Sequence, residues 1–110
     1  MNNLKVVIDA GHGGTDSGAV NGNTLEKDLT LMISRYMYNA FRDKGVDVTL
    51  IRSDDESISP SERVRRILNA YGDNSNVIII SNHINSGGGE FTYHYIIWLG
   101  IKTAIFNRLS

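Results

Sequence analysis

Three short apolar runs, separated by two segments with helical periodicity, constrain the fold of this chain more than any other feature of its sequence. The runs cover residues 4–8, 46–51 and 77–80, and turn residues bound each of them. Nearly continuous apolar runs of this length are typical of strands that are buried on both faces of a sheet. The order strand, helix, strand, helix, strand predicts right-handed crossovers. We therefore predict an α/β fold in which helices flank both faces of a mainly parallel sheet.

The two helical segments carry recognisable start and stop signals. Residues 24–44 have apolar side chains at the spacing of one helix face, and Gly45 stands where a C-terminal cap is expected. The second segment opens on Ser-Pro-Ser-Glu at residues 59–62, a capping box with proline at the first helical position. Apolar residues then follow at helical spacing until Gly72. We predict one long helix and one shorter helix.

Composition limits both the size of the core and the available chemistry. The chain has 110 residues, which is enough for a single domain. Its 11 basic and 12 acidic residues are spread along the sequence with a net charge of -1, so neither nucleic acid nor an anionic membrane is expected as a partner. There is no cysteine, which excludes disulfides and thiolate ligands. Only aspartate, glutamate and histidine remain as metal ligands.

Targeting and membrane signals are weak. Residues 1–5 lack the basic start of a signal peptide, and the apolar run that follows ends at Asp9. We therefore expect synthesis in the cytoplasm without a signal peptide. The apolar stretch 93–106 contains His94 and Lys102 and is shorter than the about 20 residues that a membrane span needs. No membrane span is expected, and the sequence makes no prediction of oligomeric state.

Two of the three histidines follow predicted strands directly. His12 comes after the first apolar run and His83 after the third. Because ligands bind beyond the carboxyl ends of parallel strands, both imidazoles are expected at the same edge of the sheet. Glu26 lies in the first turn of the first helix, which returns it to that edge. Two imidazoles and a carboxylate, with water in the fourth position, form a ligand set that zinc uses in hydrolases.

Each of these residues also has a purely structural interpretation. His12 could be a loop residue in a glycine turn, since Gly11, Gly13 and Gly14 surround it. Glu26 could be the capping-box partner of Asn23, at a helix N-terminus that favours negative charge. His83 is harder to explain in this way, because "SNH" ends an apolar strand abruptly in hydrogen-bonding groups.

Two further residues, Asp9 and Asp16, are candidates for supporting roles near the site, whereas the third histidine is not. Asp9 and Asp16 flank the first loop and could orient His12 through its second ring nitrogen, as carboxylates around metal sites do. Turn and cap roles explain both residues equally well. His94 lies in "FTYHYIIW", where side chains alternate with a period of two, so we expect it on a strand face and not as a metal ligand.

Three motifs together resemble a known family. "VVIDAGHGGTDSGAV", "TLEKDLTL" and "IIISNHINSGGGE" are similar, in this order, to the zinc-binding segments of the type 3 zinc-dependent N-acetylmuramoyl-L-alanine amidases of bacterial autolysins, spore-lytic enzymes and phage endolysins. The resemblance implies that His12, Glu26 and His83 bind one Zn²⁺ per chain. It also implies a cell-wall hydrolase that cleaves the amide between N-acetylmuramic acid and L-alanine in peptidoglycan, acting at the wall after release or export.

The resemblance covers residues 4 to about 90 and does not extend into the tail, residues 91–110. Members of the family carry a second glutamate near the end of the domain as general base for the attacking water, and this sequence reaches Ser110 without that segment. We therefore expect a single, incomplete catalytic domain over residues 1–110, with an uncovered sheet edge and apolar face. Glu90 is the nearest substitute for the general base. The alternative is a non-catalytic remnant that binds zinc or the cell wall.

Overall fold

A four-stranded sheet forms the centre of the molecule. The computed structural model describes residues 4–87 and 90–100. The strands, in spatial order, are β4 (Asp47–Leu50), β1 (Lys5–Ala10), β5 (Val77–Gly87) and β6 (Glu90–Leu99). Strand β1 pairs in parallel with β4 and β5, and β6 pairs antiparallel with β5. The predicted mainly parallel α/β sheet is confirmed, with an antiparallel strand added at one edge.

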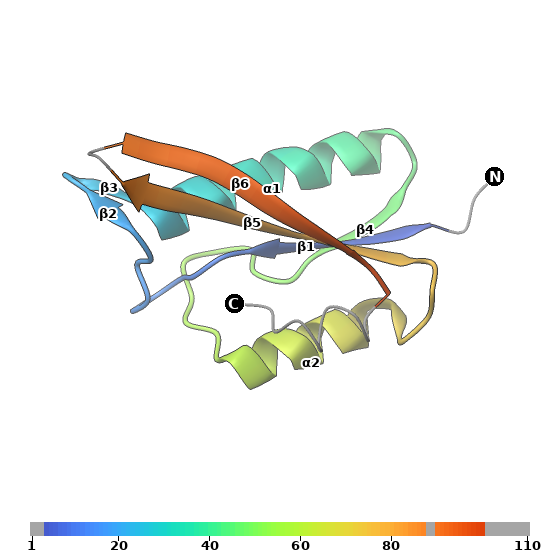
Figure 1. The fold of residues 1–110 in the computed structure, drawn as a ribbon. Coiled ribbons are helices and arrows are strands. Elements are labelled where there is room, and N and C mark those ends of the chain that lie inside the picture. Colours follow the sequence, from blue (N-terminus) through green and yellow to red (C-terminus); the bar gives the residue numbers. More distant parts are fainter. Residues whose placement is uncertain (1–3, 88–89, 101–110) are drawn as a thin grey trace.

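One helix packs on each face of this sheet, as predicted (Figure 1). Helix α1 (Glu26–Asp43) covers β1, β4 and β5, and α2 (Pro60–Tyr71) lies on the opposite face. The hydroxyl of Ser59 accepts a hydrogen bond from the Glu62 N–H at 3.1 Å, so the predicted cap of α2 is confirmed. Gly45 follows α1 with a φ of 78°, a conformation that glycine adopts without strain.

Helix α1 begins two residues later than its periodicity predicts. The preceding residues form a small antiparallel hairpin of β2 (Val20–Asn21) and β3 (Thr24–Leu25). Leu25 is the N-cap residue of α1, and no side chain caps this end. The interpretation of Glu26 as a capping-box partner of Asn23 is therefore wrong, and the Glu26 carboxylate is free for another role.

The core has two halves because side chains of the central strands alternate between the faces of the sheet. On the α2 side the buried cluster consists of Val7, Ile51, Ile67, Val77, Ile79 and Trp98. On the α1 side it consists of Val6, Ile8 and Ile80, covered by partly buried residues that include Met37 and Phe41. Full burial of each such aliphatic side chain stabilises the fold by about 1.5–3 kcal/mol.

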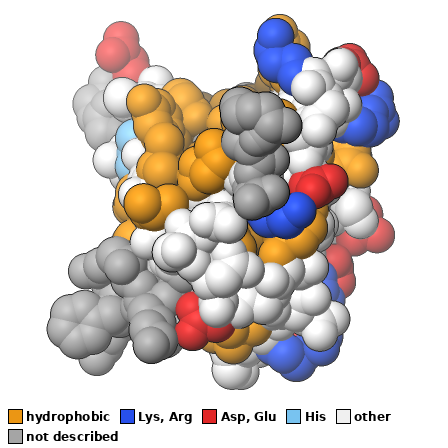
Figure 2. Space-filling view, turned by 90° about the vertical axis from the view of Figure 1, so that its right-hand side faces the viewer, with side chains coloured by type: hydrophobic (Ala, Val, Ile, Leu, Met, Phe, Trp, Pro, Cys, Tyr) orange, Lys and Arg blue, Asp and Glu red, His pale blue; other side chains and the backbone are white. Residues whose placement is uncertain are grey.

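Strand β6 is less well covered than the rest of the sheet. Its outer edge pairs with no other strand among residues 4–87 and 90–100. Exposed apolar side chains of this strand are Tyr93, Tyr95, Ile96, Ile97 and Leu99. Figure 2 shows a large gathering of hydrophobic side chains on the face that β6 and α1 share. An exposed edge and apolar face were expected; the tail beyond residue 100 lies outside the described residues.

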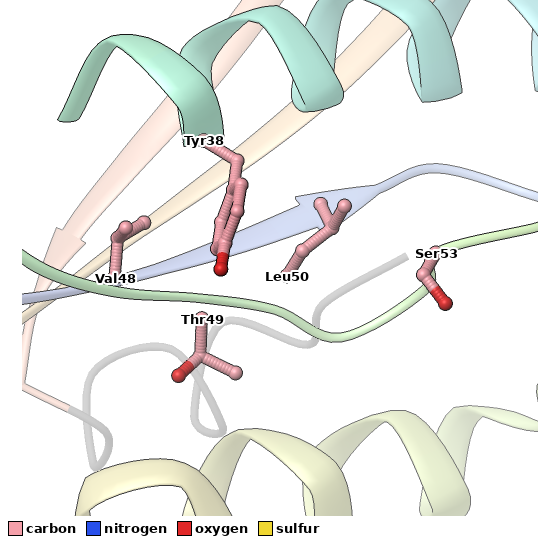
Figure 3. Close-up of a pocket in the computed structure, with 5 residues that line it drawn as sticks. All are labelled: Tyr38, Val48, Thr49, Leu50 and Ser53. Carbon is pink, nitrogen blue, oxygen red and sulfur yellow. The ribbon is translucent and has the colours of Figure 1, made fainter. Parts of the chain in front are cut away.

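A pocket of about 360 Å³ lies along the outer edge of β4, away from the predicted site. Figure 3 shows its lining: Tyr38 extends from α1 toward β4, while Thr49 points toward α2. The Thr49 hydroxyl donates to the hydroxyl of Tyr71 at 2.9 Å, which ties β4 to α2. The lining residues include no histidine or carboxylate, so this pocket is not a candidate metal site. None of the described helices combines the length and the apolar character needed to cross a membrane.

Candidate metal centre

The loop after β1 places His12 at the carboxyl edge of the sheet. His12 has a φ of 68°, a left-handed conformation that is uncommon for residues other than glycine. Two glycines, Gly11 and Gly18, lack side chains where the predicted ligands His83 and Glu26 need space. A Cβ at Gly11 would lie 2.7 Å from Nδ1 of His83, and a Cβ at Gly18 would lie 2.5 Å from Oε1 of Glu26. Any other residue at these two positions would collide with a predicted ligand.

His12, Glu26 and His83 converge as expected from their places in the chain. Oε2 of Glu26 lies 3.1 Å from Nε2 of His12 and 3.5 Å from Nδ1 of His83. One ligand atom from each residue lies within 4.8 Å of the others, so the three residues could hold a metal ion. The two imidazole rings meet edge to face, with centroids 5.6 Å apart. Glu26 and His83 are 4% and 7% exposed, while His12 lies nearer the surface.

Backbone N–H groups hold the Glu26 carboxylate in place. Oε1 accepts a hydrogen bond from Ala19 N–H, and Oε2 accepts one from Ile84 N–H, each at 2.8 Å. Glu26 is the first residue of α1, where the helix dipole favours a negative charge. A buried carboxylate that is anchored in this way keeps one oxygen directed at both histidines.

Asp16 is placed to orient His12. Its Oδ2 lies 2.8 Å from Nδ1 of His12, on the side of the ring away from Glu26. This hydrogen bond is the main reason that the pKa of Asp16 is lower than usual. A carboxylate on one ring nitrogen leaves the other nitrogen, Nε2, free to accept a metal ion.

Asp9 differs from the expectation, because its carboxylate does not contact His12. It accepts hydrogen bonds from the Arg63 guanidinium and, at 2.7 Å, from the hydroxyl of Ser81. The Ser81 oxygen in turn lies 3.0 Å from Nε2 of His83. Asp9 thus reaches the other histidine. The role of Ser81 could have been inferred from the sequence, because Ser81 is two residues before His83 and residues two apart on a strand point to the same face. Nothing in the sequence indicated the role of Arg63.

His83 and His94 face each other across β5 and β6. Burial is the main cause that lowers the pKa of His83, which favours the neutral imidazole that metal binding requires. The His94 ring stacks on that of His83 with centroids 5.7 Å apart. His94 lies on a strand face, as expected, and outside the group of three potential ligands. Its Nδ1 is buried without a hydrogen-bond partner among the described residues.

The site opens into a pocket of about 300 Å³. The described residues that line it are His12, Glu26, His83, Ile84, Asn85, His94 and Ile96. Glu26 is the one carboxylate in this described lining. Glu90, the candidate general base, is the first residue of β6; it is exposed and pairs with Gly87.

Arg52 is a second residue near the site that sequence reasoning missed. Its side chain is fully buried and donates to the carbonyl oxygens of Gly11 at 3.1 Å and Lys27 at 3.0 Å. It therefore ties the loop that carries His12 to the first turn of α1. Burial is the main cause that lowers the pKa of Arg52. No periodicity distinguishes this arginine from those on the surface, so the sequence alone could not reveal its role.

Two imidazoles and one carboxylate at the carboxyl edge of an α/β sheet, open to a pocket, are typical of metal-dependent hydrolases. The family model described as N-acetylmuramoyl-L-alanine amidase (Amidase_3) matches residues 6–99. The chain belongs to this family. The matched range contains all three potential ligands and includes strand β6.

Curated relatives and solved structures agree with this assignment. The sporulation-specific N-acetylmuramoyl-L-alanine amidase of Bacillus subtilis is 36% identical over 95 residues, which are 84% of this chain and 36% of that protein. The endolysin of Bacillus phage SPP1 is also 36% identical over 95 residues, covering 83% of this chain and 34% of that protein.

The catalytic domain of CwlV, an amidase from Bacillus (Paenibacillus) polymyxa var. colistinus, superposes with a TM-score of 0.67 at 36% identity. That superposition covers 77% of this chain and 47% of CwlV. The amidase AmiC2 of Nostoc punctiforme gives a TM-score of 0.67 at 34% identity over 81% of this chain and 48% of AmiC2. The chain therefore spans less than half the length of these relatives.

Proposed function

We propose that the chain binds one Zn²⁺ through Nε2 of His12, Oε2 of Glu26 and Nδ1 of His83. Two ligand atoms that each lie 2.0–2.1 Å from one zinc ion at a tetrahedral angle are about 3.3 Å apart. The Glu26 oxygen lies 3.1 and 3.5 Å from the two imidazole nitrogens, which brackets that value. The convergence of these three residues from separate elements is the observation that carries the proposal. When bound, zinc would polarise a scissile carbonyl and acidify a water molecule.

We infer that the substrate is peptidoglycan and that the bond cleaved is the amide between N-acetylmuramic acid and L-alanine. Membership of the amidase family over residues 6–99 supports this substrate class. The pocket beside the triad gives a scissile carbonyl access to the proposed metal position, where the Glu26 carboxylate would serve as a ligand.

We also infer that the 110-residue chain hydrolyses this amide slowly. The described lining of the pocket offers no carboxylate besides Glu26 to accept a proton from the attacking water. Glu90 lies exposed at the start of β6 and would have to turn toward the pocket. Loss of a general base lowers the rate by about a hundredfold to ten-thousandfold. The second candidate function is a non-catalytic module that binds zinc or the cell wall. It is favoured by the same observation, that the described lining of the pocket offers no carboxylate besides Glu26.

Metal analysis after mild dialysis tests the site itself. We expect about one zinc ion per chain, from the single group of three ligands described above. The His83→Ala variant should retain little zinc, because one of three ligands is gone. Equal zinc contents in the wild-type chain and in His83→Ala would contradict the proposed site.

Dye release from purified cell walls tests the activity. The wild-type chain, its Glu90→Gln variant and the full-length phage SPP1 endolysin are compared at equal zinc content. Activity close to that of the endolysin would refute slow hydrolysis, and loss of that activity in Glu90→Gln would make Glu90 the base. Absent turnover with retained binding to zinc and cell walls would favour the non-catalytic module.

A further inference from the structure

A chain of buried hydrogen bonds connects helix α2 to His83. The guanidinium of Arg63 donates to Oδ1 of Asp9, and Oδ2 of Asp9 accepts from the Ser81 hydroxyl at 2.7 Å. The Ser81 oxygen is 3.0 Å from Nε2 of His83. All four side chains are buried, and Asp9 and Ser81 are fully so. Buried polar side chains are retained when each has a partner, and here every member has one.

The direction of these hydrogen bonds follows from the number of protons available. The Asp9 carboxylate, paired with the Arg63 guanidinium, acts only as an acceptor, so the single hydroxyl proton of Ser81 points to Asp9. The Ser81 oxygen is then left to accept a hydrogen bond from the Nε2–H group of His83. In a neutral imidazole that is protonated at Nε2, Nδ1 carries the free lone pair. Nδ1 is the nitrogen that faces Glu26, at 3.5 Å.

Arg63 also holds the loop that carries the other histidine. Its Nη1 donates to the carbonyl of Ala10 at 2.9 Å, and its Nη2 donates to the carbonyl of His12 at 3.3 Å. His12 has a backbone conformation that is uncommon for residues other than glycine, and such conformations persist where the surroundings hold them. One guanidinium on α2 thus contacts both Asp9, which reaches His83 through Ser81, and the main chain of His12.

We propose that Arg63, Asp9 and Ser81 are positioning residues for metal binding. Together they hold the His83 ring with Nε2 protonated and Nδ1 directed at the metal, and they hold the main chain at His12. This inference rests on the proposed zinc site and adds to it the residues that prepare the ligands before the ion arrives. Mutation of a residue that hydrogen-bonds to a metal-binding histidine typically weakens metal affinity by about 10–100-fold.

The Ser81→Ala variant breaks this chain next to His83, and Ser34→Ala is its matched control. Ser34 is an equally buried serine, on α1, whose oxygen accepts from the side-chain amide of Asn82 at 2.9 Å. Zinc dissociation constants are measured by competition with a chelator. We expect Ser81→Ala to bind zinc about 10–100-fold more weakly and Ser34→Ala to bind it as the wild type does. Equal affinities for the two variants would overturn the proposal.

The Asp9→Asn variant gives a sharper test, because it should reverse the direction of the hydrogen bonds from residue 9 through Ser81 to His83. The amide oxygen of Asn would face Arg63, which only donates, so the amide N–H would face Ser81 and donate to it. The Ser81 proton would then turn to Nε2 of His83, and the ring proton would move to Nδ1. Loss of bulk or stability cannot produce this exchange of tautomers.

The readout is the pair of imidazole ¹⁵N chemical shifts of His83 in the metal-free protein at mildly alkaline pH. We expect Nε2 protonated in the wild type and in Ser34→Ala, and Nδ1 protonated in Asp9→Asn. A wild-type ring protonated at Nδ1, or no change in Asp9→Asn, would refute the positioning chain. A wild-type chain that shows the expected shifts but binds no zinc would instead contradict the proposed function alone.

Discussion

Zinc should stabilise the folded chain strongly, because its three ligands come from separate parts of the fold. His12 follows β1, Glu26 opens α1 and His83 lies on β5, so the unfolded chain does not hold them together. A ligand that binds only the folded state at a hundredfold excess over its dissociation constant adds about 2.7 kcal/mol to the free energy of unfolding. A change of 1 kcal/mol moves the melting temperature of a domain of this size by about 4 °C. We therefore expect a rise of about 10 °C.

The assay is thermal unfolding followed by circular dichroism, with chelator-treated protein and with excess zinc. His83→Ala should lose the rise, because it removes a ligand. His94→Ala is the matched control: it removes the imidazole that stacks on His83 but is not one of the three potential ligands, so it should keep the rise. An unchanged melting temperature in the wild type, or equal shifts in the two variants, would refute the reasoning.

Two further predictions concern helix α2. Ile67→Ala leaves a cavity at a fully buried position, so it should lower the free energy of unfolding, measured by urea titration, by about 2–5 kcal/mol. The control Leu68→Ala, at a position 37% exposed, should lower it by about 1 kcal/mol or less. The guanidinium groups of Arg65 and Arg66 lower the pKa of Glu62 to about 2, so its carboxyl ¹³C signal should titrate near that pH and move toward 4.5 in Arg66→Gln. A lowered pKa means that this charge network stabilises the fold above about pH 4.5 and loses its contribution as the pH falls toward 2; titration of wild-type Glu62 near 4.5 would contradict it.

The arrangement of the sheet was largely predictable from local patterns. Continuous apolar runs predict buried parallel strands, and the capping box at residues 59–62 predicts the start of α2, because both depend on interactions between near neighbours. The pairing of β6 was not predicted. Its alternation indicates a strand, but only the close approach of Gly87 and Glu90 decides that it turns back antiparallel to β5.

For the metal site, too, the sequence determined some features and the tertiary structure decided others. The sequence alone determined which residues meet, since His12 follows β1, His83 comes near the carboxyl end of β5 at the same edge of the sheet, and Glu26 begins the helix that returns to it. Strand β5 continues to Gly87, so His83 lies within the strand and not after it as the apolar run 77–80 predicts. The sequence also suggested Asp16 as a partner of His12. Only the tertiary structure decided the remaining supports: Asp9 serves His83 through Ser81, and Arg63 contacts both Asp9 and the main chain of His12. The physical reason is that hydrogen bonds between buried side chains require donor and acceptor atoms of residues far apart in the chain to be placed to within a few tenths of an ångström. No local period encodes such placement.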